Sequence, residues 1–407
     1  MPCCPACRQP RCRSGGARGL QTGRSRTSWC TPTGRQCRTR PGEPLTDRGD
    51  LRPARVTTAS LESVAAEWDD LAARTGGSPF VHPGWIEAWW CAFGRGELRV
   101  LAARRDGALV GVLPLGLGRG VLRSPTNEHT PVFDVVAADD AAVRVLGDAL
   151  FGERARRVTL WRLAREGAIC AGLEASGADA GYRTAVTPVA RSPYIACART
   201  LADHERALSR NLRHDVQRRL RRLCDEGSVA IEVIDGGTEL GRLLDEGFRV
   251  EALSWKGAQG TAIASDPRTR AFYDAVARWA SARGWLRLAF LRVDGRAIAF
   301  QFDLEAGRTY YSLKIGYDPA FDRYSPGKLL AHAMVARAVS TGLATYELLG
   351  LDEPWKQRWT STFREYVGFE AYAKSPAGAA SWAVATHGRR LARRIPLASR
   401  VAAALRR

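Results

Sequence analysis

The chain has 407 residues, of which 45% are hydrophobic and 25% are charged, a composition that is ordinary for a folded protein. This length allows two hydrophobic cores, because a single core rarely grows beyond about 250 residues. No apolar run reaches the roughly 18 residues of a membrane span, and the start of the chain lacks the apolar stretch of a secretion signal. The sequence therefore predicts a cytoplasmic protein.

The formal net charge of +19 would favour a nucleic-acid partner if the charge lay on the folded part. Residues 1–55 hold 12 Arg and 3 acidic residues, and residues 374–407 hold 8 Lys or Arg and no acidic residue. The two ends thus carry most of the excess charge. Our main interpretation has no nucleic-acid partner. A nucleic-acid or membrane-surface binder that acts through the basic ends is an alternative.

Cysteines gather near the start of the chain. Cys4 and Cys7 have the spacing of half a zinc site. The surrounding segment is rich in Arg, Pro and Gly, has almost no aliphatic residues and offers no second close pair of cysteines. We predict a disordered basic segment over residues 1–55 and no metal cofactor.

Two helices are predicted at the start of the ordered part. Apolar residues repeat at helical spacing over residues 59–74, where Ser60 can cap the helix. A second helix over residues 82–94 has Pro83 in its first turn and Gly94 at its end. The strands predicted after them are 98–105 and 108–115, joined by an Asp-Gly turn, then 157–163 and 192–197.

A long helix is predicted over residues 202–227, because Leu and Val recur there at helical spacing. Its other face carries a run of arginines: Arg206, Arg210, Arg213, Arg218, and Arg221 or Arg222. Such a face is either a solvated surface or a contact for the phosphates of an RNA. The pattern leaves both interpretations open.

The second half of the chain alternates strands and helices in the order β-α-α-β-β-β-α-β-α-β. Three strands within residues 285–318 are joined by turns at Asp294-Gly295 and Ala306-Gly307. The other predicted elements are a strand at 229–234, helices at 238–256, 267–284 and 325–342, a strand at 344–350, a short helix at 353–361 and a strand at 364–373.

Four stretches carry a resemblance to one family: residues 80–90, 210–223, 322–330 and 348–359. Along them the chain resembles the CelD-like (cellulose biosynthesis) acetyltransferases of the GCN5-related N-acetyltransferase (GNAT) superfamily, and it is similar to FemAB-type peptidyltransferases with two such lobes. The resemblance implies an α/β (α+β) fold with two tandem GNAT-like lobes, and we expect the basic tails at both ends to be disordered. The implied divisions are a disordered segment (1–55), an N-terminal lobe (56–200), a basic connecting helix (201–228), a C-terminal acyltransferase lobe (229–374) and a basic tail (375–407).

The helix predicted to begin at Ser325 opens on residues suited to an anion. Ser325 can cap the helix, Pro326 fits its first turn, and Gly327 lets a ligand approach the backbone. A helix N-terminus attracts phosphates, and Lys328 adds a charge. The resemblance implies that the pyrophosphate of coenzyme A rests here, with Ser325, Gly327, Lys328 and Leu329 in matching positions. A single glycine is fewer than the usual signature, and the plain alternative is an ordinary capped helix.

The strand within residues 308–318 is the one that the resemblance places beside the pantetheine arm of coenzyme A. Tyr311 could protonate the leaving thiolate as a general acid, and we count Lys314 with the cofactor-binding residues. The alternative for any tyrosine here is the ordinary aromatic composition of strands.

A polar turn follows the predicted strand 344–350. Asp352 or Glu353 could take a proton from an attacking amine, and Lys356 could hold an anionic group of the acceptor or a developing oxyanion. The plain alternative is a surface pair between Glu353 and Lys356. The resemblance favours a functional role for Asp352 and Lys356 and leaves their division of labour open.

The sequence therefore predicts an acyltransferase with acetyl-CoA (or another acyl-CoA) as cosubstrate and no metal. Its acceptor is expected to be the amine or hydroxyl of a small molecule or saccharide, and the family name points to polysaccharide biosynthesis. One alternative is a FemAB-like transferase that takes its acyl group from aminoacyl-tRNA, which the basic helix motivates. The other is the binder that acts through the basic ends.

Overall fold

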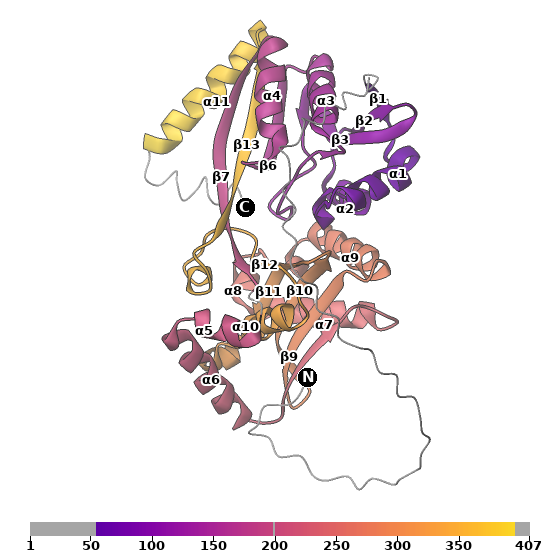
Figure 1. Cartoon of the computed structure of the whole chain (residues 1–407). Coiled ribbons are helices and arrows are strands. Elements are labelled where there is room, and N and C mark those ends of the chain that lie inside the picture. Colours follow the sequence, from indigo (N-terminus) through magenta and orange to yellow (C-terminus); the bar gives the residue numbers. More distant parts are fainter. Residues whose placement is uncertain (1–53, 198–199, 395–407) are drawn as a thin grey trace, which may run out of the picture. The chain divides into compact units, whose positions relative to one another are not determined.

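The computed structural model describes residues 54–197 and 200–394 (Figure 1). The predictions made for residues 1–53 and 395–407 lie outside the described residues. Within the described part, one sheet has the strand order β1-β2-β3-β4-β6-β13-β7-β12-β11-β10-β9-β8, with β5 paired to β3. The predicted α/β class with two lobes is confirmed. The predicted disorder of the basic tail is wrong for residues 376–394, which form a helix.

We call the part of the sheet from β1 to β7, together with β13, the N-terminal lobe. Its elements are β1 (Arg55–Ala59), α1 (Leu61–Arg74), η1 (Pro79–Val81), α2 (Pro83–Phe93), β2 (Glu97–Arg105), β3 (Ala108–Gly118), β4 (Val121–Arg123), β5 (Val136–Ala137), α3 (Asp140–Gly152), β6 (Arg157–Ala164), α4 (Ala168–Asp179), β7 (Tyr182–Ala196), β13 (Phe363–Ala373) and α11 (Pro376–Arg394).

The C-terminal lobe is the part with strands β8 to β12. Its elements are α5 (Leu201–Ala207), α6 (Arg210–Cys224), β8 (Val229–Ile234), α7 (Leu240–Leu253), α8 (Trp255–Ala258), η2 (Ile263–Ser265), α9 (Pro267–Ala282), β9 (Leu286–Val293), β10 (Arg296–Ala306), β11 (Thr309–Tyr317), η3 (Pro319–Tyr324), α10 (Pro326–Ser340), β12 (Thr345–Glu347) and η4 (Lys356–Arg358).

Local signals in the sequence explain where several elements begin and turn. The side chain of Ser60 caps α1, as predicted. Asp106 and Gly107 have φ angles of 50° and 84°, and Asp294 and Gly295 have φ angles of 47° and 80°. A two-residue hairpin turn needs this left-handed pair, so both predicted hairpins form around the expected residues.

The predicted long basic helix is wrong, because the structure divides it into α5 and α6. Leu208 has an extended backbone with φ −67° and ψ 145°. Ser209 then caps a new helix by accepting a hydrogen bond from Leu212 N–H (3.2 Å). The side-chain cap competes with continuous helix at this point.

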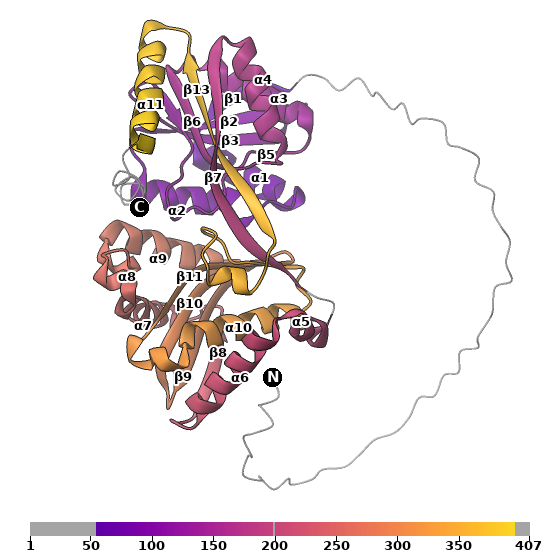
Figure 2. The ribbon, with the colours of Figure 1, turned by 90° about the vertical axis from the view of Figure 1, so that its left-hand side faces the viewer.

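Strands β7 and β13 lie side by side and link the lobes (Figure 2). Most of β7 pairs with β13, and its last three residues pair with β12. Our placement of residues 364–373 in the C-terminal lobe is wrong, because β13 pairs with β6 and β7. Val367, Phe369 and Ala371 of β13 lie in the N-terminal core. The alternation of a strand fits either sheet, so its local pattern does not choose between them.

One hydrophobic core is shared by both lobes. It joins residues of α1 and α2 to residues of α7, α9, β9 and β10. The rings of Trp85 in α2 and Phe272 in α9, for example, meet edge to face with centroids 5.1 Å apart. A second core lies in the N-terminal lobe, and a third packs α6 and α10 on the C-terminal sheet. None of the helices described in the structure is long and apolar enough to cross a membrane.

Candidate functional site

Strands β11 and β12 pair in parallel for three residues and then separate. The last pair joins Tyr311 and Glu347. After it, Leu348 N–H donates to a carbonyl of β7 (3.1 Å), and Leu349 and Gly350 turn the chain away with φ angles of 51° and 67°. In the described part of the chain, the rest of β11 therefore has no strand on this edge, and its backbone groups there can pair with a ligand.

The side chain of Glu347 is buried at the point of separation. Arg364 Nε donates to Glu347 Oε1 (2.7 Å), whereas Oε2 has no hydrogen-bond partner among the described residues. Burial raises the pKa of Glu347, and the charge of Arg364 opposes the rise. A buried carboxylate with one unoccupied oxygen is a candidate general base. We did not single out Glu347 from the sequence, although an acidic residue within an apolar strand was an available signal.

Two tyrosines accompany Glu347. Burial raises the pKa of Tyr311 to about 12, and burial likewise raises the pKa of Tyr366 on β13. The negative charge of Glu347 adds to both shifts. The ring of Tyr311 packs edge-on against Phe80 of the N-terminal lobe, with centroids 5.2 Å apart. Tyr311 thus presents a neutral hydroxyl beside the buried carboxylate.

The side chain of Lys356 is engaged within its own turn. It is buried, and its Nζ donates to the carbonyls of Leu349 (2.7 Å) and Leu351 (3.1 Å). It also lies 3.0 Å from Glu353 Oε2. An ammonium group has three donors, so these three contacts use them all. The geometry therefore favours a structural role for Lys356 over the predicted contact with an oxyanion.

The two predicted carboxylates of this turn lie nearer the surface than Glu347. Asp352 accepts a hydrogen bond from Gln357 Nε2 (2.9 Å). Glu353 is half-exposed and accepts one from Trp355 Nε1 (3.2 Å). Among the residues that the structure describes, no group of three or more His, Cys, Asp or Glu is placed to hold a metal ion.

The N-terminus of α10 lacks the side-chain cap that the sequence predicted. Ser325 has a left-handed backbone (φ 49°, ψ 59°) and its side chain accepts no capping hydrogen bond, so the predicted side-chain cap is wrong. Its carbonyl instead accepts from the N–H groups of Lys328 (2.9 Å) and Leu329 (3.2 Å). Pro326 does occupy the first turn. Two first-turn N–H groups are thus already used within the chain.

Gly327 and Lys314 also lie in unexpected surroundings. A Cβ atom at Gly327 would come within 3.3 Å of the Tyr317 ring, so the absence of a side chain lets α10 pack closely on β11. The Nζ atom of Lys314 lies 5.5 Å from the ring centre of Tyr273 in α9. The structure therefore does not bring Lys314 to the start of α10.

Lys328 joins a cluster of charges between α10 and α6. Its Nζ lies 2.7 Å from Asp215, which also pairs with Arg218 (2.8 Å) and Arg219 (2.9 Å). Burial acts to raise the pKa of Asp215, but hydrogen bonds from Lys328, Arg219 and Arg218 hold it well below its usual range. Three cations share one carboxylate here, so the cluster keeps an excess of positive charge that suits phosphate groups.

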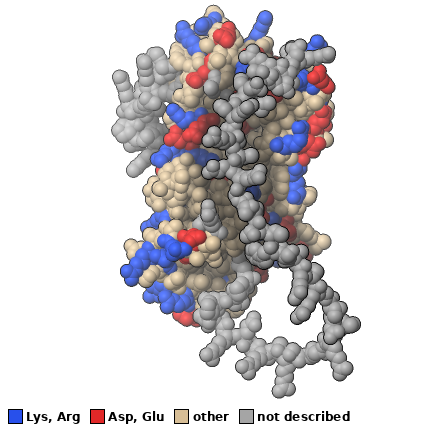
Figure 3. Space-filling view, in the orientation of Figure 1, with Lys and Arg blue, Asp and Glu red and all other residues tan. Residues whose placement is uncertain are grey.

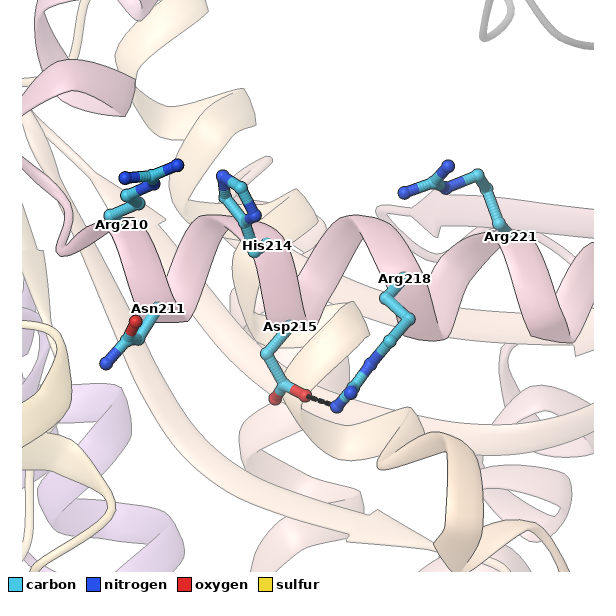
Figure 4. Close-up of a pocket in the computed structure, with 6 residues that line it drawn as sticks. All are labelled: Arg210, Asn211, His214, Asp215, Arg218 and Arg221. Carbon is cyan, nitrogen blue, oxygen red and sulfur yellow. Dashed lines mark hydrogen bonds and ion pairs between the residues drawn. The ribbon is translucent and has the colours of Figure 1, made fainter.

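The exposed side of α6 is strongly basic. Lys and Arg gather on the surface where α6 lies (Figure 3). A hollow of about 490 Å³ beside the helix is lined, among the described residues, by Arg210, Asn211, His214, Asp215, Arg218 and Arg221 (Figure 4). In this view Arg210, His214 and Arg221 project from one side of α6, and Asp215 and Arg218 from the other.

One protein-family model matches this region of the sequence. The model of a family described as acetyltransferase (GNAT) domain matches residues 210–357, which include α6, β11, α10, β12 and the start of η4. The match lies within the C-terminal lobe and supports an acyltransferase there. No curated protein matches the chain in sequence.

Several solved structures are similar in fold. FemX is 13% identical with a TM-score of 0.56, and the match covers 78% of this chain and 97% of FemX. The C-terminal domain of a putative lysylphosphatidylglycerol synthetase from Agrobacterium fabrum is 13% identical with a TM-score of 0.52, covering 79% and 95%. L-PGS from Bacillus licheniformis is 13% identical with a TM-score of 0.51, covering 80% and 96%. These similarities concern the fold, and CelD-like or FemAB-like membership remains a prediction.

Proposed function

We propose that this protein is an acyltransferase that moves an acyl group, expected to be acetyl, from coenzyme A to an amine or hydroxyl of an acceptor. The observation that carries the proposal is the separation of β11 from β12 at the Tyr311–Glu347 pair, where a buried carboxylate lies beside an unpaired strand edge. The GNAT domain match over this segment supports the same chemistry. The resemblance to the CelD-like family favours a small, sugar-like acceptor in polysaccharide biosynthesis.

In the proposed mechanism Glu347 is the general base. Its Oε2 takes a proton from the acceptor amine as the nitrogen attacks the thioester carbonyl, so that a C–N bond forms and the C–S bond breaks. The sulfur leaves as a thiolate. An ordinary cysteine thiol has a pKa of about 8.5, and a thiol of this kind is a stronger acid than Tyr311, whose pKa burial raises to about 12. Tyr311 therefore stabilises the thiolate or the oxyanion by a hydrogen bond rather than by giving up its proton.

The start of α10 is the proposed site for the pyrophosphate of coenzyme A. Lys328, with Arg218 and Arg219 of α6, supplies positive charge there. Ser325, Pro326, Gly327 and Leu329 shape the turn on which the phosphates would rest. This assignment of the cofactor-binding residues follows the family resemblance and gains the α6 arginines from the structure.

Thermal denaturation in the presence of acetyl-CoA tests the proposal. A ligand that binds the folded state raises the melting temperature, so acetyl-CoA should stabilise the wild type. Lys328→Glu should weaken this effect, whereas Lys374→Glu, which changes an exposed lysine at the end of β13, should retain it. If no acyl-CoA stabilises the wild type, the donor assignment is wrong.

An aminoacyl-tRNA donor is the second candidate, and the exposed arginines of α6 favour it. Arg210, Arg221 and Arg222 are exposed on this helix, and arginines at such spacing can contact phosphates. If tRNA is the donor, it should displace acetyl-CoA from the protein, and Arg210→Glu should abolish the competition. If coenzyme A alone is the donor, tRNA should leave acetyl-CoA binding unchanged.

A further inference from the structure

Lysine is rare in this chain, and three of its five lysines lie near the candidate site. The chain has 61 basic residues, and its lysines are Lys256, Lys314, Lys328, Lys356 and Lys374. Burial lowers the pKa of Lys314 and of Lys356, and the nearby charge of Lys256 lowers both further. Lys256 therefore lies close enough to repel each of the other two ammonium groups, near the place where β11 and β12 separate.

A β-bulge directs Lys314 towards the N-terminal lobe. The pair Phe302 and Asp303 in β10 spans three residues of β11, so the register shifts at Leu313. Leu313 packs on the core shared by the lobes, whereas Ile315 packs on the core beneath α10. The strand has thus changed face between them, and Lys314 lies on the same side as Leu313.

A cluster of uncharged polar groups lies beside the ammonium of Lys314. Its Nζ lies 5.5 Å from the ring centre of Tyr273. The hydroxyl of Tyr273 lies 3.5 Å from His129 Nδ1, and the hydroxyl of Thr269 lies 3.4 Å from His129 Nε2. Burial and the charge of Lys314 lower the pKa of His129 to about 3, so the imidazole is neutral at physiological pH. His129 comes from the N-terminal lobe, and Tyr273 and Thr269 come from α9.

The nearest carboxylates do not pair with Lys314. Glu251 lies 3.2 Å from Lys256 Nζ and accepts a hydrogen bond from Ile263 N–H (2.9 Å). Glu128 is half-exposed and lies beside His129. Within the described part of the chain, Lys314 makes the cation–π contact with Tyr273 but no ion pair or hydrogen bond. A largely desolvated charge without a counterion opposes folding, which favours a ligand as its partner.

We propose that Lys314 binds an anionic group, a carboxylate or a phosphate, on the acceptor. The inference rests on the proposed acyl transfer, because it places the acceptor between Glu347 and Lys314. Lys314 follows Tyr311 by three residues of β11, roughly 10 Å along an extended strand. An acceptor whose amine meets Glu347 could therefore reach Lys314 with an anionic group at its other end. Lys314 remains partly exposed, so a ligand can reach it.

The test compares matched amines in the presence of acetyl-CoA, with release of the free thiol as the readout. One set pairs amino acids with their amides, and the other pairs amino sugars with their phosphates. The first set tests for recognition of a carboxylate, and the second tests for recognition of a phosphate. The wild type should prefer the anionic member of at least one pair. Lys314→Met should reduce kcat/KM for that member about ten- to hundred-fold, the effect of losing a charged hydrogen bond, and Lys314→Arg should restore part of it.

Controls separate this inference from the proposed function. Lys374→Met, at an exposed position, should keep the preference, and acetyl-CoA should stabilise wild type and Lys314→Met equally. If acetyl-CoA binds but neutral amines react as well as anionic ones, the Lys314 assignment is wrong and acyl transfer stands. If acetyl-CoA does not bind, the assignment of coenzyme A as the acyl donor is wrong. The same anionic amines must then still raise the melting temperature of the wild type more than that of Lys314→Met, or the Lys314 assignment fails too.

Discussion

Glu347 of β12 and Tyr311 of β11 form the last parallel residue pair before their strands separate. A third group, the guanidinium of Arg364, reaches Glu347 from β13 (2.7 Å), a strand of the N-terminal lobe. The candidate site therefore needs both lobes. The carboxylate lies on one lobe and the cation that fixes its orientation lies on the other.

Glu347→Gln should reduce acyl transfer by about 10²- to 10⁴-fold, the usual contribution of a general base, while acetyl-CoA still raises the melting temperature. Folding raises the pKa of Glu347, so the base takes up its proton at a higher pH than an ordinary glutamate. The rate of the wild type should fall as pH drops through a value above 4.5, the ordinary pKa of glutamate. The exposed Glu365 on β13 offers a control, Glu365→Gln, that should keep the wild-type profile. A fully active Glu347→Gln protein would exclude Glu347 as the base.

Asp215→Asn should strengthen acetyl-CoA binding several-fold, because Asp215 is the carboxylate that Lys328, Arg218 and Arg219 share. Its removal raises the positive potential that a pyrophosphate meets. Calorimetry measures the affinity for acetyl-CoA. Weaker binding of acetyl-CoA by this variant would contradict the proposal that its pyrophosphate binds where α6 and α10 meet. Asp225→Asn, at the other end of α6, serves as the control and should bind as the wild type does.

Asp215→Asn should also lower the free energy of unfolding at neutral pH by about 1–2 kcal/mol. Folding lowers the pKa of Asp215, so its contribution is present above the pKa of the unfolded chain, near 3.8, and is lost as pH falls through the lower folded value. The difference in unfolding free energy between wild type and Asp215→Asn should therefore shrink only in strongly acidic solution. A constant difference across this range would show that the charge of Asp215 does not stabilise the fold.

The sequence predicted elements well wherever the signal was local. The Asp106-Gly107 and Asp294-Gly295 turns and the strand at residues 229–234 all form as expected, because backbone preferences of two residues or a short alternating run decide them. Pairing between distant strands was not predictable in this way. The position of β13 beside β7 depends on contacts more than 150 residues apart in the chain, for which the strand itself carries no signal.

The sequence pointed to some residues of the candidate site and missed others, because it shows local signals but not contacts between distant strands. Tyr311 was expected because it lies on the strand named by the resemblance. Glu347 was missed because its importance comes from burial and from Arg364, neither of which its neighbours in sequence reveal. Lys328 lies in the first turn of α10, where the sequence predicted a helix start, but its partner Asp215 is 113 residues away in the chain. The direction of Lys314 depends on a bulge, which shifts a side chain to the other face without altering the alternating pattern.

Gly316→Ala should destabilise the protein by about 1–3 kcal/mol, the usual cost of overpacking. A Cβ atom at this position would lie 2.4 Å from the Cα atom of Glu251, so α7 and β11 would have to move apart. Lys256 should then lose its hydrogen bond to the carbonyl of Ile315 (2.6 Å). Gly241→Ala, in α7, would place its Cβ in open space and should stabilise the helix by up to about 1 kcal/mol. Equal melting temperatures for the two variants would contradict the close approach.

Lys356→Met should lower the free energy of unfolding by about 2–3 kcal/mol, because it leaves the buried carbonyl of Leu349 and the carbonyl of Leu351 without their donor. Urea denaturation measures this loss, and Lys374→Met serves as the exposed control. Since Lys356 holds the turn after Glu347 rather than the reacting oxygen, activity should fall together with stability. Lower temperature or a bound acyl-CoA, both of which favour the folded turn, should restore much of the activity. A variant that is as stable as the wild type but inactive would instead place the ammonium of Lys356 on the transition state, as its position in the sequence had led us to expect.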